Sequence, residues 1–149
     1  MRYSAAAIAW ALVAFGLAGT GAAAPRLVDG YARPSVPGAM MGAAYVTLSN
    51  DGPDDRLVGV TSPLAAEAAL FGPAETADGV LHQQPHEGGL PLPSGGTLVM
   101  ERGGDCIMLF DLDAPLQSGQ TVPLRLRFEH AAPLDVTVTV DPSRESPAN

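Results

Sequence analysis

The chain has 149 residues and carries 8 basic side chains, all arginines, against 16 acidic ones, for a formal net charge of −8. This acidic balance argues against a nucleic-acid-binding surface, which needs clustered positive charge. The single cysteine excludes an intrachain disulfide framework and a zinc site built from cysteines alone. The length allows one domain.

The N-terminal segment has the layout of a secretory signal peptide. Arg2 precedes an apolar run from Ala5 to Leu17, and small residues follow up to Ala24. The run of roughly 13 residues is shorter than the roughly 20 that a membrane-spanning helix needs. We therefore expect cleavage within two residues of Ala24, export to the periplasm and no stable membrane insertion afterwards.

Short apolar runs separated by Gly, Pro, Asp and Asn dominate the rest of the chain, which is typical of an all-β sandwich or barrel. The expected strands are Arg26–Ala32, Ala43–Ser49, Arg56–Thr61, Glu67–Phe71, Val80–Gln84, Thr97–Glu101, Cys106–Leu112, Thr121–Glu129 and Leu134–Val140. The clearest alternation places Leu124, Leu126 and Phe128 on one face and Arg125 and Arg127 on the other.

Two segments need separate treatment. Pro63–Leu70 is rich in alanine, which favours a helix, but it is short and uncapped, and we expect a turn that leads into a strand. Residues 141–149 are polar and are expected to form a disordered tail. Residues 25–140 then make up one domain.

No catalytic motif stands out. The sequence lacks a Gly-x-Ser-x-Gly elbow, a phosphate-binding glycine loop and His-Glu-x-x-His. Cys106 could pair with His82, His86 or His130 as a nucleophile and base, but almost any sequence with a Cys and a His offers such a pair. We therefore expect that the protein is not an enzyme.

A soft metal site is the more specific possibility. Cys106 and Met108 are two residues apart on an expected strand, so their sulfur atoms lie on the same side of the sheet. Thiolate and thioether ligands select Cu(I) over hard cations. The alternative is core packing, because Cys and Met are both common in protein interiors.

Other potential ligands are less specific. His82 and His86 lie within five residues of each other, which raises the case for a metal only modestly. Met40 and Met41 form a thioether pair that is equally compatible with loop packing. His130 follows a strand and is expected on the surface.

Several sequence blocks together resemble the periplasmic copper chaperones of the PCu(A)C family, also described as DUF461. The blocks are Tyr31-Ala-Arg-Pro34, Pro37-Gly-Ala39, Gly42-Ala-Ala-Tyr-Val-Thr-Leu-Ser-Asn50, Asp55-Arg-Leu-Val-Gly-Val60, Glu87-Gly-Gly89, Leu92-Pro-Ser-Gly-Gly-Thr97 and Met108-Leu-Phe-Asp-Leu112. The resemblance covers roughly residues 27–140. It implies a cupredoxin-like Greek-key β-sandwich that binds Cu(I) and delivers it to the CuA centre of cytochrome c oxidase. The implied partners are the copper ion and an oxidase subunit or another copper chaperone.

The metal-binding motif of that family, His-x10-Met-x21-His-x-Met, is altered in this sequence. Phe71 stands where the first His is expected, and the first Met falls on His82 or Gln83, depending on the alignment. The final His-x-Met becomes Cys106-x-Met108. One Met is thus kept and one His is exchanged for Cys.

Two interpretations of this departure remain. In the first, Cys106 and Met108, with His82 or His86, still bind Cu(I), since a thiolate is a better soft donor than an imidazole. In the second, the protein has kept the sandwich, lost the metal and serves as an interaction or assembly module. The first is favoured because Cys is a chemically sensible replacement at a ligand position.

Overall fold

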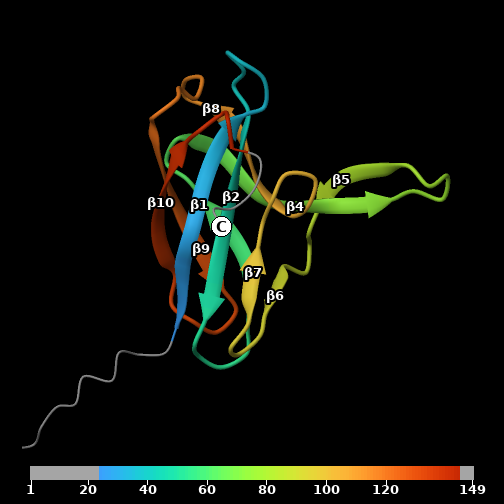
Figure 1. Ribbon diagram of the computed structural model, residues 1–149, viewed down its shortest axis with the longest axis vertical. Coiled ribbons are helices and arrows are strands. Elements are labelled where there is room, and N and C mark those ends of the chain that lie inside the picture. The colour runs from blue at the N-terminus through green and yellow to red at the C-terminus, as the bar shows by residue number, and fades with distance from the viewer. Residues whose placement is uncertain (1–23, 145–149) are drawn as a thin grey trace, which may run out of the picture.

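The structure is a computed structural model that describes residues 24–144 (Figure 1). Residues 1–23 of the predicted signal peptide and residues 145–149 of the predicted tail lie outside the described part of the chain. All regular secondary structure between residues 24 and 144 is β-strand. In that part of the chain, no helix has the length and apolar character needed to cross a bilayer.

Ten strands are present in the described residues, and all nine predicted strands are among them. They are β1 (Pro25–Pro34), β2 (Gly42–Asn50), β3 (Asp55–Thr61), β4 (Ala65–Glu75), β5 (Leu81–Pro85), β6 (Leu90–Leu92), β7 (Thr97–Val99), β8 (Cys106–Leu112), β9 (Thr121–Phe128) and β10 (Leu134–Val140). Only β6 was not expected. The predicted all-β fold class is therefore confirmed.

The strands form one hydrogen-bonded path in the order β5-β4-β8-β2-β1-β10-β9-β3-β6, with β7 paired to β2. All pairs are antiparallel except β1 with β10, which makes the sheet mixed. The sheet curls around a single apolar core, to which β4, next to one end of the path, and β6, at the other end, both contribute. The hairpin formed by β4 and β5 projects from this body, with β5 at one edge of the sheet (Figure 1).

The alternation read from the sequence builds this core. In β9, Leu124, Leu126 and Phe128 are buried, whereas Arg125 and Arg127 are exposed. Since successive side chains of a strand point to opposite faces, burying one face of β9 necessarily leaves the arginines in solvent.

The two segments singled out in the sequence behave differently. Pro63 and Leu64 form a turn, and β4 begins at Ala65, as expected. The first part of the predicted disordered tail is ordered instead, which corrects that prediction for residues 141–144. Asp141 donates its backbone N–H to the Ala32 carbonyl at 2.9 Å, because β10 runs parallel to β1 and leads the chain alongside the last residues of that strand.

Candidate metal centre

Strand β8 carries the two sulfur-containing side chains on one face. In the antiparallel register with β4, Cys106 lies opposite Phe71 and Met108 lies opposite Ala69. Ile107, between them, is fully buried in the core. Because directly opposite residues of neighbouring strands share a face, the two sulfur side chains lie on the side of the sheet that also carries the Phe71 ring.

The Cys106 thiol is shielded from solvent. Its residue is 5% exposed, and Sγ lies 3.9 Å from Oε1 of Gln83, to which the thiol donates. Burial, together with the nearby Asp105 carboxylate, raises the pKa of the Cys106 thiol to about 11. The thiol is therefore protonated at neutral pH, and a metal ion that binds the sulfur must displace this proton.

Gln83, and not His82, occupies the position next to the thiol. In the β4–β5 hairpin, Gln83 lies opposite Pro73, which is two residues from Phe71 and so shares its face. His82 is the neighbour of Gln83 on the same strand and points to the opposite face. Of the two alignments that the sequence left open, the one with Gln83 matches the geometry.

His86 also lies on the face away from the sulfur atoms. Its Nε2 is 2.8 Å from Oδ1 of Asp105, and its ring packs against Gly72, where a β-carbon would collide with it. The structure therefore does not bring His82 or His86 together with Cys106. The two-residue period of β5 sends the His82 side chain to the face opposite Gln83, and His86, just after β5, lies against Gly72 on that face.

The remaining ligand position of the family motif is apolar. Phe71 lies directly opposite Cys106 on β4, and its ring packs on that of Phe110 with centroids 5.7 Å apart. Across residues 24–144, no group of three or more His, Cys, Asp or Glu side chains could hold a metal ion. A soft site at this face thus depends on the sulfur atoms of Cys106 and Met108.

Two tyrosines extend the same face on the other side of β8. Tyr45 stands two residues after Ala43 on β2, and its pKa is raised by burial and by the nearby Cys106. The rings of Tyr45 and Tyr31 stack with centroids 4.9 Å apart, and the Arg144 guanidinium lies 4.4 Å from the Tyr31 centroid. Sequence reasoning missed this pair, because the alternation of β2 assigns Tyr45 to a face but does not show that β2 pairs with β8.

His130 lies elsewhere and is a surface residue, as expected. Its side chain is 67% exposed, and Nε2 is 3.9 Å from the Glu129 carboxylate. The backbone N–H groups of His130 and Ala131 donate to the Asp55 carboxylate at 3.0 and 2.9 Å, and these two bonds hold the turn.

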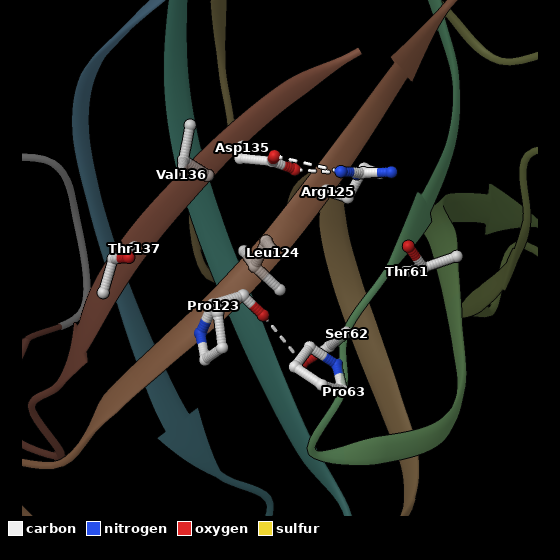
Figure 2. Close-up of a pocket in the computed structure, with 9 residues that line it drawn as sticks. All are labelled: Thr61, Ser62, Pro63, Pro123, Leu124, Arg125, Asp135, Val136 and Thr137. Atoms are coloured by element: carbon white, nitrogen blue, oxygen red, sulfur yellow. Dashed lines mark hydrogen bonds and ion pairs between the residues drawn. The ribbon is translucent and has the colours of Figure 1, made fainter.

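A large surface cavity lies away from the sulfur atoms. This open hollow has a volume of about 540 Å³ and lies over β9, β10 and the end of β3. Figure 2 shows the side chains around it. The residues that line it are Thr61, Ser62, Pro63, Pro123, Leu124, Arg125, Asp135, Val136 and Thr137. Its polar groups bond to one another: Arg125 holds the Asp135 carboxylate in a bidentate pair, and Ser62 donates to the Pro123 carbonyl. None of its lining side chains is a soft metal ligand.

Comparisons with known sequences point to a family described as lipoproteins. Residues 26–140 match the LpqE-like family, described as "Putative lipoprotein LpqE-like". The "Putative lipoprotein Lxx21020" of Leifsonia xyli subsp. xyli (strain CTCB07) is 36% identical over 104 residues, which are 69% of this chain. The chain spans 62% of the length of that curated relative.

Solved structures resemble the fold over most of its length. The solution structure of apo-DR1885 from Deinococcus radiodurans is 30% identical, covers 98% of this chain and 97% of its own, and has a TM-score of 0.60. Its Cu(I) form is 32% identical, covers 86% of this chain and 85% of its own, and has a TM-score of 0.62. The copper-bound PCuAC domain of PmoF2 is 20% identical and covers 78% of this chain and 92% of its own, with a TM-score of 0.62, which is a likeness of fold.

Proposed function

The chain belongs to the LpqE-like family of PCuAC proteins, and from this premise we propose that it is an exported carrier that binds Cu(I) through Cys106 and Met108 and passes it on. The membership confirms the resemblance read from the sequence blocks, and the cupredoxin-like β-sandwich that it implied is confirmed as well. The observation that carries the proposal is the common face of the two sulfur side chains.

The donor chemistry supports monovalent copper. A thiolate and a thioether are soft ligands, which favour Cu(I) over hard cations. Two sulfur donors leave a coordination position of Cu(I) open. A side chain of the recipient can therefore bind the ion before Cys106 and Met108 dissociate from it. Transfer by such ligand exchange is the reaction expected of a carrier. His82 and His86 are not included in the proposed ligand set, because they lie on the opposite face.

The recipient and the compartment are further parts of the proposal. We place the protein in the periplasm, on the basis of the predicted signal peptide and of the lipoprotein family that it matches. The recipient that the family resemblance implies is the CuA centre of cytochrome c oxidase, reached directly or through another copper chaperone. The copper-bound and Cu(I)-bound titles of PmoF2 and DR1885 support copper as the cargo.

Three observations favour a second candidate function. Cys106 is buried, Phe71 stands where the family motif has a histidine, and Gln83, which contacts the thiol, offers only an amide. A relative that has lost the metal and acts as an interaction or assembly module would have these features. It predicts that copper has no effect on the melting temperature of the protein, whereas a ligand at 100 times its Kd adds about 2.7 kcal/mol to the free energy of unfolding.

The test is a titration of the reduced protein with Cu(I) in competition with a chelator. We expect one equivalent to bind and the Cys106→Ser variant to lose this binding. Met100→Leu is the matched control. Met100 is a fully buried sulfur-containing residue directly after β7, and it lies outside the proposed ligand pair. Absence of binding in the unsubstituted protein, or equal binding by Cys106→Ser, rejects the proposal.

A further inference from the structure

The exposed side chain of Gln83 contacts the buried Cys106 thiol. Gln83 is exposed, and its amide reaches from β5 toward β8, where Oε1 lies 3.9 Å from Cys106 Sγ and Nε2 donates to the Gly104 carbonyl at 3.4 Å. Cys106 itself is 5% exposed. Because an exposed group contacts a buried one, the Gln83 amide lies on the solvent side of the sulfur.

The position of Gln83 allows it to move. Strand β5 is at the edge of the sheet, and all five of its residues are exposed. No neighbouring strand therefore holds the outer side of β5 in this part of the chain. Rotating the amide outward breaks one weak S–H···O contact and one long N–H···O hydrogen bond. Water molecules can then form hydrogen bonds with the amide in place of these two contacts.

The Gln83 amide is better suited to cover the thiol than to bind Cu(I) as a ligand. Cu(I) prefers sulfur and nitrogen donors, whereas an amide oxygen is a hard donor. While Oε1 accepts the thiol proton, Sγ is protonated and covered. A soft ion can therefore reach the sulfur only after the amide has moved away and the proton has left.

We propose that Gln83 is the gate of the Cys106 site: its amide covers the thiol in the closed state and swings out to admit a soft metal ion or another thiol-directed reagent. The metal step rests on the proposed function. The covering of the thiol does not, because it concerns the metal-free protein. Gln83 is thus a positioning residue that sets the rate at which Cys106 is reached.

The test uses the single cysteine of the chain, since alkylation by iodoacetamide then reports on Cys106 alone. In the reduced, metal-free full chain we expect Gln83→Ala to be alkylated about fivefold faster than the unsubstituted protein, in line with the loss of two weak hydrogen bonds. Gln84→Ala is the matched control: it removes the same amide one residue along the same strand, on the opposite face. Its rate should stay within twofold.

Three outcomes overturn the gate. They are an unchanged rate in Gln83→Ala, an equal increase in Gln84→Ala, and an increase that vanishes at high pH. The last needs a rate profile that is followed until the rate levels off above the thiol pKa, because a gate raises this plateau, whereas a change in thiol acidity only moves the midpoint. Melting temperatures of all variants check that none reacts faster merely because it is unfolded.

A second measurement, on the Cu(I)-loaded protein, then separates this inference from the proposed function. With Cu(I) loaded, Gln83→Ala should release the ion to a chelator at least fivefold faster, whereas Gln84→Ala should not. If the unsubstituted protein binds no Cu(I) while the alkylation difference stands, the function fails and the gate holds. If Cu(I) binds but neither the alkylation rate nor the release rate changes in Gln83→Ala, the gate fails and the function holds.

Discussion

The two faces of strand β8 serve different purposes. Ile107 and Leu109 point inward and are fully buried in the apolar core. Cys106 and Met108 point to the other face, where Cys106 is also buried, Met108 is half-buried and the Gln83 amide contacts the thiol. Under the proposed function, the first face requires only volume and apolarity, whereas the second requires the two sulfur atoms. An apolar residue of the same size can replace a core side chain, but it cannot replace a sulfur ligand.

Substitutions on the core face should affect stability most. Leu109→Ala removes a fully buried side chain and leaves a cavity, so it should lower the free energy of unfolding by about 2–5 kcal/mol. Met108→Ala on the other face should cost clearly less, because Met108 is only half-buried. Urea denaturation followed by circular dichroism measures both. Equal losses would show that the two faces are packed alike, which would contradict the comparison.

The Cu(I) affinity of the face that carries Cys106 and Met108 should depend on pH. The pKa of the Cys106 thiol is about 11, so between pH 6 and 8 each Cu(I) that binds releases one proton. Proton and metal compete for Sγ, and the Cu(I) affinity should therefore rise about tenfold per pH unit, or about a hundredfold over this range. Chelator competition at several pH values, corrected for the chelator's own protonation, measures this slope. A flat profile would exclude the Cys106 thiol as a ligand.

The second sulfur offers a smaller and cleaner separation of the two faces. Met108→Leu keeps the volume of the side chain, so the free energy of unfolding should change by less than about 1.5 kcal/mol. It removes one soft donor, and the Cu(I) affinity should fall about tenfold. Met100→Leu makes the same exchange at a buried core residue and should leave the affinity unchanged. Equal affinities of both variants would leave Met108 as packing only.

Local pattern was enough to predict most of the fold. The alternation in Thr121–Phe128 and Leu134–Val140 specified both the strands and their buried face. Strand β6 was missed because Leu90-Pro91-Leu92 is too short to show a period, and its proline argues against a strand. It forms because β3 supplies a partner from far along the chain.

Only the part of the candidate site that lies within one strand could be predicted, because the pairing between strands cannot be read from the sequence. Cys106 and Met108 belong to one strand, so their spacing alone fixes their common face. Whether His82 or Gln83 joins them depends on how β5 pairs with β4, and a shift of one residue exchanges the two faces. The turn that sets this pairing has a left-handed Gly79, with a φ of 79°, but several registers are compatible with that feature in sequence alone.

The smallest effects are expected for the histidines of the β4–β5 hairpin, because they lie on the face opposite the Cys106 thiol. His86→Ala removes the partly exposed pair with Asp105, which should lower the free energy of unfolding by no more than about 1 kcal/mol. The Cu(I) affinity should stay within about twofold, because the imidazole lies across the sheet from Sγ. His82→Ala serves as the exposed control. A tenfold loss of affinity in either variant would show that a histidine of the hairpin takes part in copper binding, which would contradict the placement of both imidazoles across the sheet from the thiol.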